Sequence, residues 1–504
     1  MKKISIYEPG VLTLGIILAI ISAAICMQIM GMFGTAPNTS LIVAVLIMII
    51  ARIPINALKK FGNLERQNYI MSIASAAGFS AANGAFIGIS MLLILGRDNL
   101  VIPLSIGMLT ASIISVFSTY KLFDSKIFPS SGSWPMANAA AKILEAGNEG
   151  GKKSKELIQG IVVGAILNQF GLPATGIGIA VVANIGTMAA MGIGSLISGF
   201  SPLLFDFNFS DTNIAQGIMI GAGVIAFFQI IISIKNMKTK PQEECCDATI
   251  SETTAKKSLV LTFILFIAGA VLTAYITSLF SYMSNVNMIL WILYVGISTL
   301  ITMLLVGTAS MHSGIAPSFA VVTLFLTIGI ILGFEPIALA IMVGYVSCVG
   351  MVFADTGIGL KTGHIIRNGI DEAYGRRQQT IMKFLGVIIG VIMAFFFGSY
   401  IIDGGAIPPM SIFYARSVSD SIDITLFLDL LMWSIPGAIL QFIFGNKQVG
   451  LMLATGLLIG NGLFGAFILI TLLFRIKFGV KTMAVRGPGL IAGDGLWGFI
   501  RIFL

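Results

Sequence analysis

Chemically capable side chains are concentrated in one stretch of the chain, residues 352–379, which lies between two apolar segments. It holds a carboxylate, an ammonium, an imidazole and two hydroxyls, on Asp355, Lys361, His364, Thr356 and Thr362, with glycines interleaved. Ionisable groups at membrane depth mark a pathway or a binding site. Glycine-rich backbone is tolerated there where it is buried in protein or lines a wet cavity. Such a stretch could bind a charged solute or carry a proton. The alternative is a cytoplasmic loop whose basic residues set the orientation, which we favour for Arg376 and Arg377.

Lys361 and Asp355 are the expected partners in this stretch. A lysine at membrane depth costs about 2.5–3.5 kcal/mol on insertion scales, so we expect its ammonium to meet a carboxylate, either that of Asp355 or one on a bound solute. Asp355 is also the first choice for a proton-carrying group, because we place it at the mouth of a glycine-rich break where water enters. The alternative is that Asp355 only caps the following turn.

Two earlier segments also carry polar side chains. In the span around 69–95 small residues recur four apart, which favours close helix packing, and Asn83 is the polar group inside that span. Further on, Trp134 and Pro135 belong to a turn that precedes helix-forming sequence from Asn138. This pattern predicts a half-helix whose N-terminal amides could face an anion. The alternative is a surface helix at the cytoplasmic interface, anchored by Trp134.

The elements that position these residues must be membrane helices. Of 504 residues, 57% are hydrophobic and 10% are charged. This composition predicts an all-α polytopic membrane protein with about 14–16 membrane segments. The net charge of +8 comes from basic residues in short loops, where they act as orientation signals, so we expect no nucleic-acid partner. His312 and His364 are the only histidines, and no metal-ligand pattern, phosphate loop or nucleophile elbow accompanies them. We therefore expect neither an enzyme nor a cofactor.

Lysines and arginines predict the orientation. The N-terminus and the loops at 119–127, 235–257 and 475–486 are rich in them and are expected to face the cytoplasm. However, the apparent spans between these loops are odd in number in both parts of the chain. We therefore expect a re-entrant or broken helix in each part, or a crossing supplied by the glycine-rich stretch itself.

This shared irregularity favours an internal repeat with an offset of roughly 240 residues, in which polar connections at 119–156 and 355–380 correspond. The alternative is the chance regularity of any long polytopic chain. The predicted organisation is an N-terminal transmembrane half (1–234), a cytoplasmic linker (235–257) and a C-terminal transmembrane half (258–504).

Several segments together resemble the oligopeptide transporter (OPT) superfamily, in particular its prokaryotic branch, which is related to the yellow stripe-like metal-chelate transporters. The resemblance rests on four runs in the family's order: Ala74–Gly84, Trp134–Lys153, Asp355–His364 and Gly450–Gly460. The chain departs from the family where acids are expected, at Phe79, Gly359 and Asn461. We place Asn461 with the pathway residues. The acids and histidine left for a proton relay are Asp206, Asp211, Asp355, Asp403 and His364.

The resemblance implies a secondary active transporter, coupled to protons, that moves small peptides or related metal chelates across a cytoplasmic membrane. It implies a small-molecule or peptide substrate and a lipid bilayer as partners, and assembly into a homo-oligomer is one option. The lost carboxylates favour an alternative, an uncoupled channel or facilitator for a small solute. A membrane-embedded enzyme would need paired carboxylates or a metal constellation, which the sequence lacks.

Overall fold

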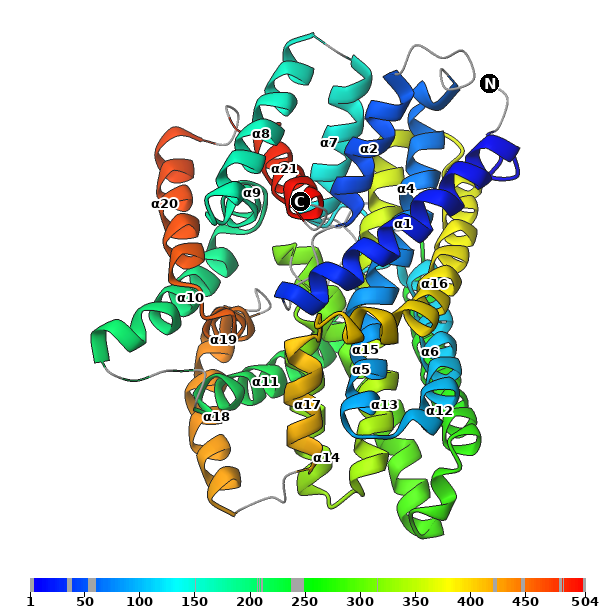
Figure 1. The fold of residues 1–504 in the computed structure, drawn as a ribbon, viewed down its shortest axis with the longest axis vertical. Coiled ribbons are helices and arrows are strands. Elements are labelled where there is room, and N and C mark those ends of the chain that lie inside the picture. Colours follow the sequence, from blue (N-terminus) through cyan, green and yellow to red (C-terminus); the bar gives the residue numbers. More distant parts are fainter. Residues whose placement is uncertain are drawn as a thin grey trace. The chain divides into compact units, whose positions relative to one another are not determined.

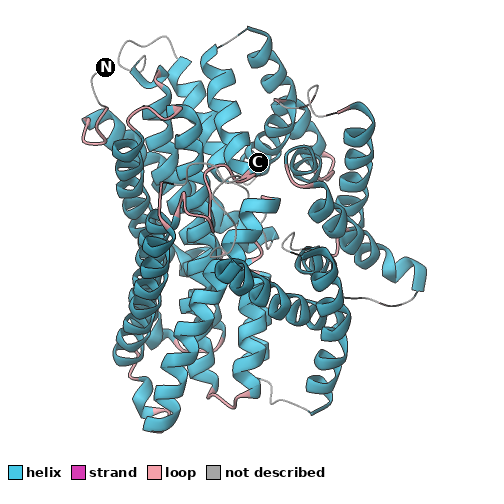
Figure 2. Cartoon of the chain, turned by 180° about the vertical axis from the view of Figure 1, so that it is seen from behind, coloured by secondary structure: helices cyan, strands magenta, loops and turns pink. Residues whose placement is uncertain are grey.

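The structure is a computed structural model. It describes residues 4–501 except 34–38, 53–59, 150, 206, 208, 210–211, 237–248, 315, 420–423, 446–448, 480–482 and 484. The described part is helical and contains no strand, only an isolated bridge between Phe123 and Phe128 (Figures 1 and 2). Its α-helices are α1 Pro9–Phe33, α2 Thr39–Arg52, α4 Leu64–Ser80, α5 Phe86–Ile94, α6 Val101–Leu122, α7 Pro135–Glu149, α8 Gly151–Gln169, α9 Ala174–Val182, α10 Ile185–Phe205, α11 Ile214–Asn236, α12 Glu252–Ile276, α13 Asn285–Ser313, α14 Ser318–Ile331, α15 Pro336–Arg367, α16 Glu372–Asp403, α17 Pro409–Ser419, α18 Ile424–Phe444, α19 Val449–Ile459, α20 Gly462–Phe478 and α21 Arg486–Ile500.

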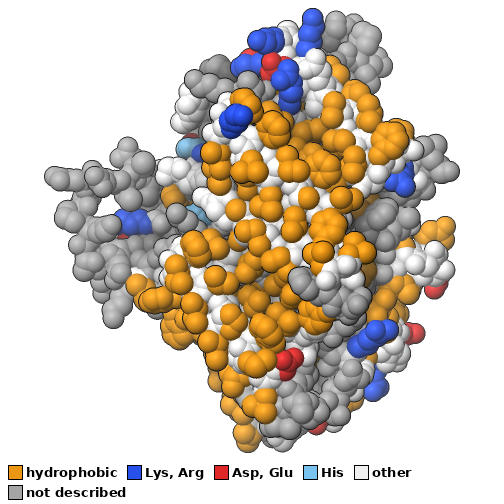
Figure 3. Space-filling model, turned by 90° about the vertical axis from the view of Figure 1, so that its left-hand side faces the viewer, with side chains coloured by type: hydrophobic (Ala, Val, Ile, Leu, Met, Phe, Trp, Pro, Cys, Tyr) orange, Lys and Arg blue, Asp and Glu red, His pale blue; other side chains and the backbone are white. Residues whose placement is uncertain are grey.

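Many of these helices are long and apolar enough to cross a bilayer. Among the described residues there are 8 such segments, and five further apolar helices are shorter. Hydrophobic side chains cover much of the described surface in Figure 3, while lysines and arginines gather mainly at its upper end. A surface of this kind needs lipid around it, because soluble proteins rarely expose large contiguous apolar patches. The prediction of an all-α polytopic membrane protein is confirmed.

The chain divides into two compact units, each built from separate stretches of sequence. The first unit comprises Met1–Ser130, Asp247–Gly307 and Phe325–Ser421, and the second comprises Ser131–Cys246, Thr308–Leu324 and Ile422–Leu504. Both units therefore take segments from each of the two halves expected from the sequence. We describe each unit by itself.

Helix α15 is the central element of the first unit. It packs against α4, α6 and α16, and 89% of its most apolar window is buried, against 33% for the peripheral α12. The helix runs unbroken from Pro336 to Arg367, so the expected glycine-rich break after Asp355 was wrong. Backbone groups at membrane depth must be hydrogen-bonded, and a continuous helix achieves this without water. Its glycines instead allow close approach: a Cβ on Gly359 would lie 2.7 Å from Lys383 Cε.

Helices α4 and α16 also touch backbone to backbone. A Cβ on Gly386 would lie 2.3 Å from the Ile73 carbonyl oxygen, and one on Gly390 would lie 2.5 Å from that of Ala77. These contacts are at Ile73 and Ala77, next to Ala74 and Gly78 of the small-residue pattern and not at those residues themselves. Helix α4 continues through a π-helical turn, Ala81–Ala85, into α5.

One end of the first unit is tied together by a junction between the loop after α6, the segment before α12 and the start of α16. The Asp124 carboxylate accepts hydrogen bonds from the amides of Ser130 (3.1 Å) and Thr249 (3.2 Å), and from the Thr249 hydroxyl (2.7 Å). Arg376 donates to the Phe123 carbonyl (3.2 Å). Helix ends that lie far apart in sequence therefore meet at this junction.

The junction predicts an acid-dependent loss of stability. Burial raises the pKa of Asp124, but the hydrogen bonds from Ser130 and Thr249 outweigh it and hold that pKa below its ordinary value. A lowered pKa stabilises the fold above the unfolded pKa of about 3.9, and the contribution is lost as pH falls through the folded pKa. Asp124→Asn should therefore cost about 1–3 kcal/mol at pH 7.

Thermal unfolding of purified protein at pH 7 and at acidic pH tests this expectation. The difference between wild type and Asp124→Asn should shrink as the pH falls below the folded pKa. Asp98→Asn, at the exposed opposite end of α6, is the control and should behave like wild type at both pH values. A pH-independent gap for Asp124→Asn would contradict the prediction.

The second unit contains two broken helices. The first break, at 183–184, separates α9 from α10, and the Asn184 side chain accepts from the Gly186 amide (2.9 Å) to begin α10. The second break, at 460–461, separates α19 from α20, and Asn461 accepts from the Phe464 amide (3.0 Å). Gly460 has φ +59°, a left-handed conformation that ends α19. The prediction of broken helices is confirmed, but they lie here and not at the glycine-rich stretch.

The helices around these breaks pair in a repeated pattern. Helix α8 packs on α21 as α18 packs on α11, and α9 contacts α20 and α21 as α19 contacts α10 and α11. Asn461 follows Asn184 by 277 residues, which replaces the expected offset of roughly 240. The predicted offset of roughly 240 residues came from pairing the connections 119–156 and 355–380. Most of 355–380 lies in helices α15 and α16, so it is not a connection.

Candidate functional site

A buried ion pair lies in the core of the first unit. The Lys383 ammonium on α16 is 2.5 Å from the Asp355 carboxylate on α15, and their side chains are 0% and 1% exposed. Lys383 also donates to the Asp355 carbonyl (3.1 Å) and to the Ser75 hydroxyl on α4 (2.8 Å). Ser40 on α2 donates to the other carboxylate oxygen (3.3 Å). Both charges are compensated, as burial requires, because an unpaired charge at this depth would be very costly.

The expected partnership of Lys361 with Asp355 was wrong. Six residues along an α-helix correspond to about 600° of rotation and about 9 Å of rise, so the two side chains leave α15 in different directions. Lys361 instead donates to the Ser130 carbonyl (2.5 Å), at the end of the loop that follows α6. Its hydrogen bond fastens α15 to that loop.

A chain of polar contacts leads from the edge of the first unit to the ion pair. Arg367 forms two hydrogen bonds with Glu372 (2.8 and 3.1 Å) and donates to Gln379 (2.8 Å). Gln379 donates in turn to the Ser72 hydroxyl (3.2 Å) and to the Gly359 carbonyl (2.7 Å). Ser75 donates to the Ser72 carbonyl (3.4 Å) and accepts from Lys383. We call these residues, from Glu372 through Arg367, Gln379, Ser72 and Ser75 to Lys383, the polar chain.

An unsatisfied amide lies beside the polar chain. Asn68 is fully buried, and neither polar atom of its side chain has a partner. Its Nδ2 lies 2.7 Å from the point that a Cβ on Gly363 would occupy, close to Gln379 and Arg367, which flank the same point. Buried amides are normally hydrogen-bonded, so Asn68 is an exception among the polar groups beside the polar chain.

His364 is at the outer end of the polar chain. Its Nδ1 is 3.6 Å from a Glu372 oxygen, and its side chain is 33% exposed. Glu372 also contacts Arg367, which reaches Glu65 on α4 (3.3 Å). A titratable imidazole, two carboxylates and a guanidinium thus connect the surface to the buried pair.

The other predicted residues of the first unit take more ordinary positions. The hydroxyls of Thr356 and Thr362 donate to carbonyls of their own helix, at 2.7 and 2.8 Å. Asn83 lies in the π-helical turn between α4 and α5, and its side-chain nitrogen has no hydrogen-bond partner. Asp403 is the last residue of α16, and Asp206 and Asp211 lie outside the described residues.

Trp134, Pro135, Asn138 and Asn461 belong to the second unit. Trp134 is buried with φ +33°, and its amide donates to the Met311 carbonyl (2.9 Å). Pro135 begins α7, so the predicted helix after this turn is confirmed. Asn138 donates to the Ser133 carbonyl (2.5 Å), which secures the turn. Asn461 caps α20.

Lys383, Gln379 and Arg367 were missed as site residues. On α16 the polar side chains Glu372, Arg376, Gln379 and Lys383 are spaced by four, three and four residues, which places them on one helical face. That spacing was the available signal. It was overlooked because the arginines nearby were interpreted as orientation anchors, although Arg376 is in fact buried.

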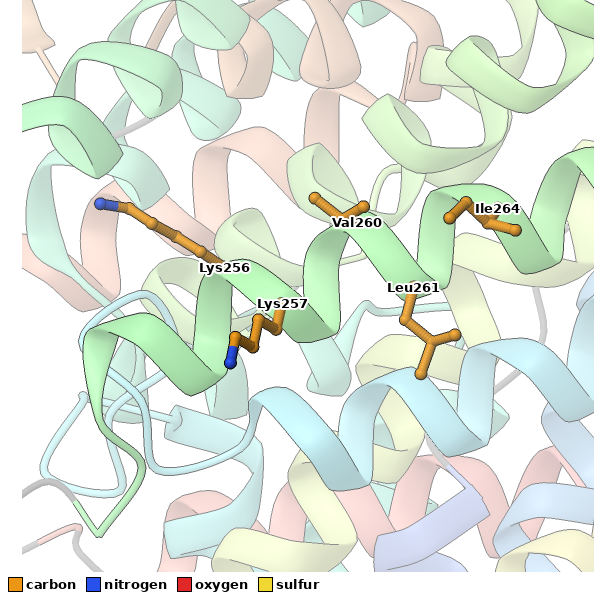
Figure 4. Close-up of a pocket in the computed structure, with 5 residues that line it drawn as sticks. All are labelled: Lys256, Lys257, Val260, Leu261 and Ile264. Carbon is orange, nitrogen blue, oxygen red and sulfur yellow. The ribbon is translucent and has the colours of Figure 1, made fainter.

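A surface pocket on α12 is a weaker candidate. Its lining consists of Lys256, Lys257, Val260, Leu261 and Ile264 (Figure 4). The three apolar side chains are exposed to between 43% and 60%. Two lysines followed along the helix by exposed apolar side chains are typical of the place where a helix enters a bilayer. Lipid chains would therefore cover this pocket.

Residues 10–234 match the family model described as OPT oligopeptide transporter protein. The match includes the runs at Ala74–Gly84 and Trp134–Lys153, whereas those at Asp355–His364 and Gly450–Gly460 lie beyond it. A comparison with curated proteins found no match.

Proposed function

We propose that this chain is a proton-coupled secondary transporter of the OPT oligopeptide transporter family, whose family model its residues 10–234 match. Its cargo would be small peptides or related metal chelates, carried across a cytoplasmic membrane. The observation that supports coupling is the fully buried ion pair between Asp355 and Lys383, on two helices that are both long enough to span the bilayer. Ionisable groups at such depth are characteristic of proton and ion pathways.

The ion pair can couple protonation to a change of conformation. One proton added to Asp355 leaves the Lys383 ammonium without a counter-charge, which a dry interior does not tolerate. The protein then favours an arrangement in which Lys383 reaches water or a cargo carboxylate. The hydrogen bonds of the polar chain from Glu372 to Lys383 would give a proton a path to the pair.

Uptake by proteoliposomes tests the proposal. Purified protein should accumulate a short peptide, or a chelate from a screened set, above its outside concentration when the outside is acidic. Collapse of the pH gradient with a protonophore should leave only equilibration. Equilibration without accumulation under every gradient would favour the uncoupled facilitator, which the residues Phe79, Gly359 and Asn461 at expected acid positions also favour.

We further propose that the junction around Asp124 faces the cytoplasm. At this end of the first unit lie Lys121, Lys126, Lys256 and Lys257, together with the start of α16 and its two arginines. The start of α1 belongs to the same end, because the Ile6 amide donates to Gln378 (3.1 Å). Positive charge favours the cytoplasmic side, so the N-terminus should lie there too.

Accessibility labelling checks this orientation. On a background without the native cysteines, Lys257→Cys at the start of α12 should be labelled by an impermeant thiol reagent only after the membrane is opened. Ser281→Cys, just past the other end of α12, is the matched control and should be labelled in intact cells. The opposite pattern at the two positions would invert the proposed topology.

A further inference from the structure

The two broken helices of the second unit, α9–α10 and α19–α20, are related by the repeat. Each break lies beside the segment that follows the other break. The break between α9 and α10 lies beside Arg475 of α20, and the break between α19 and α20 lies beside Ser195 and Ser198 of α10. Arg475 follows Ser198 by 277 residues, the same interval that separates the two capping asparagines. Ser198 is thus the counterpart of Arg475.

At the first break a cation is built into the protein. Arg475 donates to the carbonyls of Ala180 (2.9 Å) and Ala183, which end α9. The last carbonyls of a helix have no partner within it and carry partial negative charge, so a cation there is favourable. The guanidinium satisfies this first helix end.

At the second break the corresponding cation is missing. Ser198 has a hydroxyl that is buried (3% exposed) and has no hydrogen-bond partner. That oxygen lies 3.4 Å from the point that a Cβ on Gly460 would occupy, and the Leu457 carbonyl oxygen lies 3.9 Å from the same point. Ser195 donates to the Asn461 carbonyl (2.9 Å), so its own oxygen also lies at the break. The Ser195 and Ser198 hydroxyls and the Leu457 carbonyl oxygen therefore lie at the end of α19, and among the described residues no lysine or arginine is found in contact with this break.

We propose that the break between α19 and α20 binds a monovalent cation, either a sodium ion or the ammonium group of a substrate. The ligands would be the last carbonyls of α19 and the Ser198 hydroxyl. Hard oxygen donors of this kind suit both sources, and unwound helix ends supply them in membrane transporters. The inference concerns the second unit and does not depend on proton coupling at Asp355.

Binding to the purified full-length chain tests the inference. Radioactive sodium should bind saturably to wild type, and Ser198→Ala should weaken binding by about tenfold or more, since one hydrogen-bonding group to a charge is lost. Ser201→Ala is the matched control: Ser201 is equally buried on α10, but its hydroxyl donates to the Ser198 carbonyl of its own helix (2.8 Å). Ser198→Lys should place a tethered ammonium in the site and abolish sodium binding.

A second arm distinguishes the two sources of charge. If sodium does not bind, dialanine should protect wild type from thermal unfolding, whereas N-acetyl-dialanine should not, and Ser198→Ala should lose the protection. The inference is overturned if neither probe binds, if Ser198→Ala binds like wild type, or if Ser201→Ala loses binding equally. The size-exclusion elution profile identifies a variant that does not fold. If Ser198→Lys does not fold, the comparison of Ser198→Ala with wild type tests the inference.

Discussion

Replacing Lys383 by Met while Asp355 stays in place should lower the free energy of unfolding by about 3–5 kcal/mol, because an uncompensated carboxylate is left in a dry interior. Asp355→Asn should have a comparable effect, since it leaves the ammonium with only hydroxyl and amide partners. The side chains are 0% and 1% exposed, so water cannot replace the lost partner without rearrangement of the helices.

The double variant Asp355→Asn/Lys383→Met should recover most of this loss. With both charges removed, no desolvated ion remains, and neutral pairs of similar volume are often as stable as buried ion pairs. Thermal unfolding in nanodiscs of wild type, both single variants and the double variant measures the coupling. Lys256→Met is the control, since it breaks an ion pair with Glu252 on the surface of α12 and should change stability by no more than about 1 kcal/mol. Additive losses in the double variant would show that the two residues act independently.

The fold class followed from composition because long apolar runs have few solutions in a bilayer. Broken helices were also predictable from the mismatch between basic loops and span number. Their location was not, because three glycines near Asp355 resemble a break while the true breaks at 183–184 and 460–461 contain a single glycine. In α15 the glycines make room for the side chains of Lys383, Gln379 and Arg367. These contacts become visible only when the helices are packed together.

The candidate site was half predictable. Asp355 was identified because a carboxylate in an apolar segment is conspicuous, but its partner was sought on the same helix. Lys383 comes 28 residues later and reaches Asp355 only because α15 and α16 form an antiparallel pair joined by a short turn at 368–371. A single lysine in the sequence does not by itself indicate whether its side chain faces inward. The helical spacing of Gln379 and Lys383 carries that information only once α16 is known to begin at Glu372.

The transport consequence of the ion pair is best measured in the double variant. A single Asp355→Asn change confounds coupling with stability, because it leaves Lys383 unpaired. Asp355→Asn/Lys383→Met removes the titratable groups and keeps the interior neutral. If Asp355 carries the coupling proton, the double variant should exchange labelled cargo across proteoliposomes in counterflow, yet lose accumulation driven by a pH gradient.

The two assays separate the possible roles of the pair. Counterflow requires that the protein bind cargo and switch between its outward-facing and inward-facing conformations. Accumulation also requires that a proton cross the membrane with the cargo. Lys361→Met, which loses the hydrogen bond to the Ser130 carbonyl but leaves the ion pair intact, is the matched control on α15 and should retain a pH-dependent component of uptake. Full gradient-driven accumulation by a folded double variant would reduce the ion pair to a structural element. Coupling would then have to lie with His364 and Glu372 at the outer end of the polar chain, where a 3.6 Å contact already joins an imidazole to a carboxylate.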